Sequence, residues 1–135
     1  MSSPLRLLVF GGRDFADREW LYAVLDRIHS EPGISVIIQG DEPGTDTMTR
    51  EWAESRRVPV EIYAAAWSDL SAPGAHIKRG RHGDYNARAG HDRNQRMIDE
   101  GKPDAAVQIS SGAGTTDMAR RLRVAGLPIW ERIGS

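Results

Sequence analysis

Small and hydroxyl-bearing residues cluster in the stretch SSGAGTT, which begins at Ser110. The stretch follows an apolar run at residues 105–109 and leads into a segment with helical spacing. Glycine lets the backbone approach a ligand closely, and the free N–H groups at the start of a helix attract anions. These properties predict a phosphate-binding loop formed by Ser110, Ser111, Gly112, Ala113, Gly114, Thr115 and Thr116. The alternative is an ordinary turn in which Thr115 or Thr116 caps the following helix.

Two other loops have the same character and also follow apolar runs. The first contains Gly11, Gly12, Arg13 and Asp14, and the second contains Gly40, Gly44, Thr45 and Asp46. In an open parallel sheet, ligands bind beyond the carboxyl ends of the strands. We therefore expect the three loops to meet around one ligand.

Arginines supply the positive charge that would hold a phosphate. Arg13 follows a Gly-Gly turn, and Arg93 precedes Asn94 at the start of a predicted helix. A guanidinium in such a place binds phosphate through two parallel hydrogen bonds. Because Arg93 ends a long polar segment, we expect its side chain to face solvent. Other basic residues of that segment are interpreted as a solvated surface: Lys78, Arg79 and Arg81.

One aromatic and three acidic residues complete the candidate site. Trp67 follows the third apolar run, where an indole could stack on a base. Asp14, Asp41 and Asp46 could accept a hydrogen bond from a ribose hydroxyl. Acidic residues near helix starts are also ordinary partners of the helix dipole, and that alternative stays open.

The histidines do not form a metal-binding pattern. His76, His82 and His91 share one polar segment, but their spacing matches no common set of metal ligands. We therefore predict neither a metal site nor a bound cofactor.

The composition and net charge of the chain limit the classes of function that the protein can have. The chain has 135 residues, 39% of them hydrophobic, a formal net charge of −1 and no cysteine. These values are typical of one soluble domain without disulfides or thiolate metal sites. The near-neutral charge and the lack of a basic, aromatic stripe count against nucleic-acid binding, and the apolar runs are too short to cross a membrane. We expect a single cytoplasmic domain over residues 1–135. This domain could form a homodimer or a higher homo-oligomer.

Alternating strands and helices must position these loops. The apolar pattern predicts strands at residues 5–10, 34–38, 58–63, 105–109 and 127–130. It predicts helices at residues 17–30, 45–57, 88–100 and 116–124. This order favours an α/β fold, a Rossmann-like three-layer sandwich with a mostly parallel five-stranded sheet and helices on both faces. Residues 64–87 show no core periodicity, and we interpret them as a long loop that covers the site. Within this loop, we expect residues 68–87 to be more mobile than the sheet and to become protected when a ligand binds.

Several motifs resemble a known family over nearly the whole chain. They are GGRDF at Gly11, G-x3-G-T-D at Gly40, W-A at Trp52, A-x-W at Ala65, A-G-x2-R-N-x2-M at Ala89, P-D at Pro103 and G-x-G-T-x2-M at Gly112. Together they are similar to the DUF2493 family, the YspA/YpsA-related branch of the SLOG superfamily. The resemblance implies a single Rossmann-like domain that binds a nucleotide or a nucleotide-derived ligand. It also adds Gly90 and Asn94 to the candidate site.

The chain departs from the LOG-type phosphoribohydrolases, which are distant relatives in this superfamily. Their signature ends in a catalytic glutamate, and Met118 stands at that position here. Asp117 is one residue away, which turns its side chain by about 100° around a helix. Methionine cannot activate water, so the resemblance favours a sensor-like binding protein without LOG-type hydrolysis.

Two alternatives from other classes remain at this point. One is a hydrolase that acts on the N-glycosidic or phosphate bond of a nucleotide or an ADP-ribose-type molecule, with Asp14, Asp46 or Asp117 as its base. The other is a single-strand nucleic-acid binder, which the charge balance disfavours.

Overall fold

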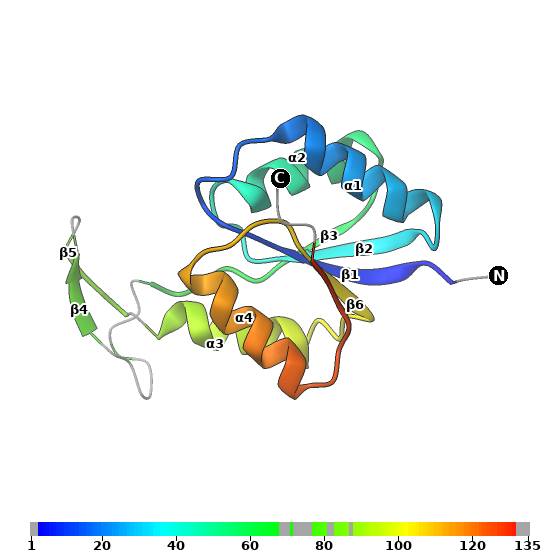
Figure 1. The fold of residues 1–135 in the computed structure, drawn as a ribbon. Coiled ribbons are helices and arrows are strands. Elements are labelled where there is room, and N and C mark those ends of the chain that lie inside the picture. The colour runs from blue at the N-terminus through cyan, green and yellow to red at the C-terminus, as the bar shows by residue number, and fades with distance from the viewer. Residues whose placement is uncertain (1–2, 68–70, 72–76, 81–82, 87, 132–135) are drawn as a thin grey trace.

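A computed structural model describes residues 3–67, 71, 77–80, 83–86 and 88–131 of the chain (Figure 1). The elements are, in order, β1 (Leu5–Phe10), α1 (Arg18–Ser30), β2 (Ile34–Gln39), α2 (Thr45–Ser55), β3 (Val60–Ile62), β4 (Ile77–Gly80), β5 (Gly83–Asn86), α3 (Ala89–Asp99), β6 (Ala105–Gln108), α4 (Ala113–Val124) and β7 (Ile129–Glu131). None of the described helices is long and apolar enough to cross a membrane.

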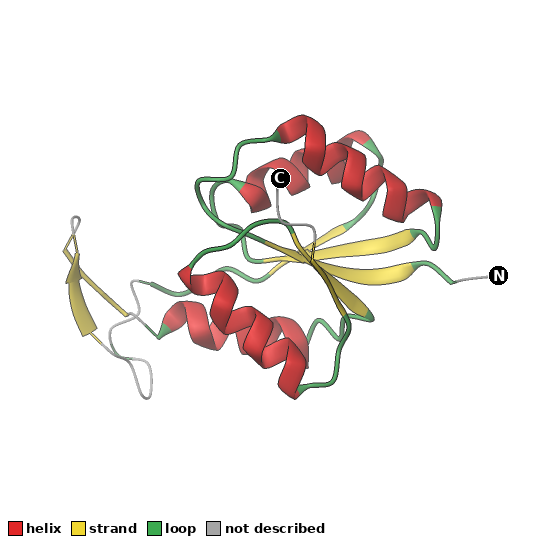
Figure 2. Ribbon diagram, in the orientation of Figure 1, coloured by secondary structure: helices red, strands yellow, loops and turns green. Residues whose placement is uncertain are grey.

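Five strands form one parallel sheet in the order β3-β2-β1-β6-β7. The chain runs outward from β1 to β3 and then returns to place β6 on the other side of β1. The strand order therefore reverses between β1 and β6, which is where open α/β sheets place ligands. Helices α1 and α2 cover one face and α3 and α4 the other (Figure 2). The predicted three-layer α/β sandwich is confirmed.

The central strands contain continuous apolar runs, at residues 7–10 of β1, 36–38 of β2 and 105–107 of β6, because both faces of the sheet are buried there. Leu7 and Val9 of β1 belong to the core under α1 and α2, whereas Leu8 and Phe10 belong to the core under α3 and α4. Leu7, Leu8 and Val9 are 0% exposed. This central strand anchors the loop that leaves its carboxyl end.

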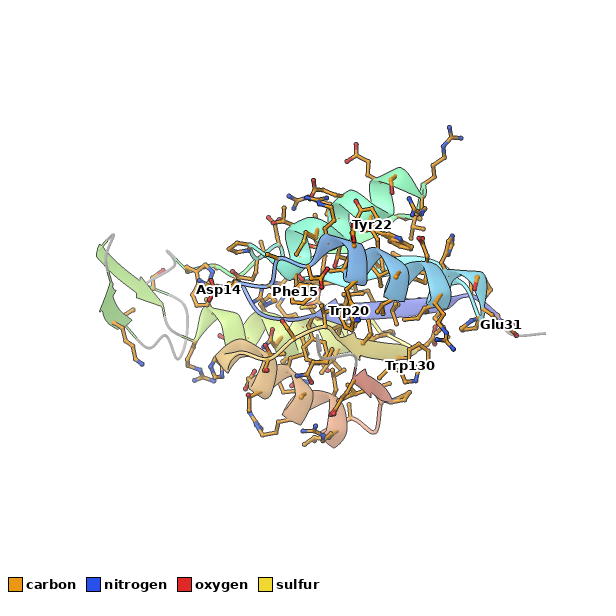
Figure 3. All side chains as sticks on the ribbon, turned by 45° about the horizontal axis from the view of Figure 1, so that its top comes forward. Asp14, Phe15, Trp20, Tyr22, Glu31 and Trp130 are labelled. Carbon is orange, nitrogen blue, oxygen red and sulfur yellow. The ribbon has the colours of Figure 1, made fainter. Side chains whose placement is uncertain are left out.

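The first helix begins as the sequence predicts. Asp17 is its N-cap, and the carboxylate accepts a hydrogen bond from the Trp20 N–H. The loop before it carries Asp14 and Phe15 at one end of the sheet, and Glu31 follows the helix at the opposite end (Figure 3). Phe15 makes an edge contact with Trp20, with ring centroids 5.9 Å apart. This contact fixes the path of the β1–α1 loop.

The prediction that residues 64–87 lack secondary structure is wrong. Strands β4 and β5 pair antiparallel, with Gly80 opposite Gly83 (Figure 1). The pair forms a separate two-stranded sheet to one side of the three-layer body, so its residues need not show core periodicity. The predicted mobility of this segment also involves residues 68–70, 72–76, 81–82 and 87, which lie outside the described residues.

Candidate functional site

A cleft of about 710 Å³ lies at the carboxyl ends of β1, β2 and β6. The three predicted loops meet there, together with the first turns of α3 and α4. Most residues singled out from the sequence line it: Gly11, Gly12, Arg13, Asp14, Gly40, Asp46, Trp67, Gly90, Arg93, Asn94, Ser110, Ser111, Gly112, Gly114 and Thr115.

Four other predicted residues do not line the cleft, and three of them shape its loops. Thr45 is 0% exposed, and its hydroxyl donates to the Gly12 carbonyl over 3.0 Å. Gly44 has φ +76°, and a Cβ there would lie 2.2 Å from the Arg13 carbonyl oxygen, so this position requires glycine. Thr116 is exposed and donates to the Gly112 carbonyl. Ala113 begins α4.

Helix α4 begins three residues earlier than predicted, at Ala113. Its N-cap is Gly112, which offers no side-chain cap, so the alternative in which Thr115 or Thr116 is the cap is wrong. Ser110 accepts a hydrogen bond from the Gly12 N–H over 2.7 Å and thereby joins this loop to the β1–α1 loop. The first turn of α4 thus has no capping side chain, and its residues Gly112, Gly114 and Thr115 line the cleft.

Arg93 is buried, contrary to the expectation that it faces solvent. It is 8% exposed and donates to the Gly40 carbonyl over 2.7 Å, to Glu42 Oε1 over 3.2 Å and to Asn94 Oδ1 over 3.0 Å. The β2–α2 loop covers the Arg93 side chain through its residues Gly40 and Glu42, which lie about 50 residues earlier in the chain. These contacts use one N–H from each nitrogen, and a guanidinium has five, so two N–H groups have no partner among the residues that the structure describes.

Glu42 joins the two predicted arginines and was missed in the sequence. Its Oε1 lies 3.2 Å from Arg93 Nη2, and its Oε2 lies 3.1 Å from Arg13 Nη2. An acidic residue between Gly40 and Gly44 was the available signal. Other lining residues not predicted as site residues are Val9, Phe10, Phe15, His91, Met97 and Met118.

Trp67 forms part of the cleft wall. The Arg13 guanidinium lies 5.8 Å from the centroid of its ring, a cation–π distance. A Cβ on Gly90 would lie 2.7 Å from the Trp67 ring, so the missing side chain leaves room for the indole. Glycine in the first turn of α3 therefore has a packing role beside the cleft.

Asp46 is a buried carboxyl group in the first turn of α2. Its Oδ2 accepts hydrogen bonds from the N–H groups of Gly40 and Glu42, over 3.2 and 3.1 Å. Burial raises the pKa of Asp46 to about 6, although the two N–H groups and the Arg93 charge lower it. Such a group changes protonation state near neutral pH.

The carboxylate next to Met118 is held away from the cleft. Asp117 is 8% exposed and accepts hydrogen bonds from Arg121 over 2.8 Å and Asn94 over 3.1 Å. Burial acts to raise the pKa of Asp117, but these hydrogen bonds outweigh it and hold the pKa below its ordinary value. His91 Nδ1 lies 3.1 Å from the same carboxylate. Met118 itself lines the cleft and is 2% exposed.

The described ranges contain no group of three His, Asp or Glu side chains that could hold a metal ion. The polar side chains that line the cleft include two guanidinium groups, three carboxylates, the hydroxyl groups of Ser110, Ser111 and Thr115, the Asn94 amide and the His91 imidazole. The guanidinium and backbone N–H groups can bind an oxyanion, and a carboxylate can accept hydrogen bonds from hydroxyl or amino groups.

The close packing of Gly40 on Arg93 gives a first testable prediction. In Gly40→Ala, the Cβ would lie 2.2 Å from Arg93 Nη1, so the guanidinium must move away from the Gly40 carbonyl. We expect the free energy of unfolding to fall by about 1–3 kcal/mol in denaturant titrations. The matched control is Gly114→Ala, where nothing lies within 4 Å of the added Cβ. Equal stability of both variants would contradict this description of Arg93.

Comparison with known proteins supports the fold and the family. The crystal structure of Acinetobacter baumannii MurG matches with a TM-score of 0.56 and 13% identity. The match covers 93% of this chain but only 33% of that one, so the chain spans a third of the length of the MurG structure and shares its fold alone. No curated protein sequence matches the chain. Residues 5–69, which include the β1–α1 and β2–α2 loops, match the model of the YspA, cpYpsA-related SLOG family. Over this segment the chain is similar to the YspA, cpYpsA-related SLOG family, in agreement with the resemblance read from the sequence motifs.

Proposed function

We propose that the cleft binds a nucleotide or a nucleotide-derived molecule through its phosphate. The observation that carries the proposal is the meeting of Arg93, Arg13 and the uncapped N-terminus of α4 in one cleft. The phosphate would bind the backbone of residues 112–116, with both arginines as counter-charges. Trp67 lies beside Arg13 and offers an aromatic face to the base. Similarity to the SLOG family supports this class of ligand.

The same residues favour binding over LOG-type hydrolysis. Met118 occupies the position at which the LOG-type enzymes carry their catalytic glutamate, and a thioether cannot accept a proton from water. Asp117 is engaged by Arg121 and Asn94 and does not line the cleft. We therefore propose a sensor-like binding protein.

A thermal-shift screen with product detection tests this function. The probes are AMP, GMP, CMP, UMP and ADP-ribose, each at up to millimolar concentration at pH 7.5. A ligand present at about 100 times its Kd adds about 2.7 kcal/mol to the free energy of unfolding. We expect at least one probe to stabilise the protein without release of free base, ribose 5-phosphate or inorganic phosphate. Turnover of a probe would favour the hydrolase alternative, and no stabilisation by any probe would overturn the proposal.

Glu42 gives a second prediction, because its carboxylate occupies both arginines that the phosphate would contact. In Glu42→Gln, the competing charge is absent and a phosphate is no longer repelled. We expect the Kd of the best-binding nucleoside monophosphate to fall roughly 10-fold by calorimetry. The control is Glu51→Gln, which removes an exposed ion pair with Arg18 on the outer side of α2. Weaker binding by Glu42→Gln would mean that Glu42 positions the arginines for the ligand.

A further inference from the structure

One oxygen of Asp46 stands apart from the other buried polar side-chain atoms that the structure describes. Its Oδ1 exposes less than 1 Å² to solvent and has no hydrogen-bond partner among the described residues. Its neighbour Gln39, 0% exposed, uses both ends of its amide, donating to the Asp46 carbonyl and accepting from the Asp41 N–H. The amide of this buried neighbour is therefore fully used, whereas the unpaired oxygen belongs to a residue that lines the cleft.

The fold gains nothing from leaving this atom unpaired. A buried acceptor without a partner destabilises a protein by about 1–3 kcal/mol, and more if it is charged. Oδ2 already orders the β2–α2 loop through the N–H groups of Gly40 and Glu42, and an asparagine could do the same. A purely structural role explains Oδ2 but leaves Oδ1 unexplained.

The position of Asp46 relative to the arginine subsite indicates what would bind there. Asp46 Oδ2 binds the N–H of Gly40, and Arg93 Nη1 binds the carbonyl of the same residue. The Asp46 carboxylate and the guanidinium that we propose to bind phosphate thus contact the backbone of the same residue, Gly40. In a nucleotide, sugar hydroxyls lie this close to the phosphate, whereas the amino groups of the base lie beyond the sugar.

We propose that Asp46 Oδ1 accepts a hydrogen bond from a sugar hydroxyl of the ligand, so that the cleft selects ribose phosphates over their deoxygenated counterparts. This inference rests on the proposed function and specifies the sugar that the same cleft takes. The ionised carboxylate is the better acceptor. The charged groups that act on it are Arg93 from α3 and Glu42 from its own loop, which have opposite effects on its ionisation.

The experiment measures the Kd of AMP, GMP, CMP and UMP and of the 2′,3′-dideoxy counterpart of each, for the wild type and Asp46→Asn at pH 7.5. We expect the wild type to bind the best ribonucleotide at least 10-fold more tightly than its dideoxy form. In Asp46→Asn, we expect this ratio to fall several-fold, because the asparagine must keep its oxygen on the two backbone N–H groups and can offer the hydroxyl only a neutral amide donor, which replaces a charge-assisted hydrogen bond with a weaker one. Thermal unfolding establishes that the variant is folded.

The matched control is Glu51→Gln, which changes an exposed carboxylate of the same helix that pairs with Arg18. We expect this control to keep the wild-type ratio. A ratio that is the same in the wild type and Asp46→Asn would overturn the inference while leaving the proposed function intact. If none of the eight nucleotides binds the wild type, the proposed function fails and the inference fails with it.

Discussion

Arg93→Ala is expected to weaken the binding of the best nucleoside monophosphate by roughly 10- to 150-fold. The estimate corresponds to the loss of charge-assisted hydrogen bonds of about 1.5–3 kcal/mol. The two N–H groups of Arg93 that remain outside its contacts with Gly40, Glu42 and Asn94 would make these bonds. Calorimetric titration with the nucleotide measures the change in Kd.

Burial makes Arg93→Ala a structural change as well, so a second variant is needed. Alanine leaves the Gly40 carbonyl and one side of Glu42 without the guanidinium, and we expect some loss of stability. Arg93→Lys keeps the charge but cannot form the planar fork, and we expect it to bind with intermediate affinity. The control is Arg96→Ala on the same helix, an exposed residue that pairs with Glu100. Unchanged affinity in a folded Arg93→Ala protein would remove Arg93 from the site.

Asp46→Asn is expected to change how stability depends on pH. The folded-state pKa of Asp46 is about 6, above its ordinary value of 3.8, because the side chain is buried. The folded protein therefore binds this proton more tightly than the unfolded chain does. The bound proton therefore stabilises the folded state fully below about pH 4, and this stabilisation is lost as the pH rises through 6. At about 1.4 kcal/mol per pKa unit, the loss amounts to about 3 kcal/mol.

The measurement is the difference in unfolding free energy between Asp46→Asn and the wild type at pH 4, 6 and 8. Groups common to both proteins cancel, so we expect this difference to become more favourable to the variant as the pH rises. Asp26→Asn is an opposite control, since hydrogen bonding to Arg56 lowers the pKa of Asp26. The ionised Asp26 stabilises the fold at neutral pH, and this stabilisation is lost in acid. The free energy of unfolding of Asp26→Asn should therefore fall further below that of the wild type as the pH rises. A difference for Asp46→Asn that does not vary with pH would contradict the buried, proton-binding state of Asp46.

The location of the site could be predicted from the sequence, because it depends on local patterns. Each glycine-bearing loop follows a short apolar run, and parallel strands bring their carboxyl ends to one edge. Gly12 and Ser110 illustrate this, since their loops are 98 residues apart and share a hydrogen bond of 2.7 Å. The order of strands and helices sufficed for this prediction.

The polar contacts inside the site could not be predicted in the same way. Arg93 ends a hydrophilic segment, and its burial depends on Gly40 and Glu42 of a loop about 50 residues earlier. The role of Glu42 follows from two ion pairs that exist only when β1, β2 and α3 have come together. The hairpin β4–β5 was missed because neither strand packs in the main sheet and so neither needs an apolar face.

Titration of the ¹⁵N-labelled wild-type protein with a nucleoside monophosphate, followed by NMR, tests the central claim most directly. The claim is that the phosphate binds between the start of α4 and the two arginines. It predicts the largest shift changes for the backbone amides of Gly12 and residues 112–116 and for the side-chain Nε–H of Arg93. Amides of α1 and β7, such as those of Val24 and Trp130, should remain unchanged. Shift changes confined to such distant residues, or none at millimolar nucleotide, would contradict the claim.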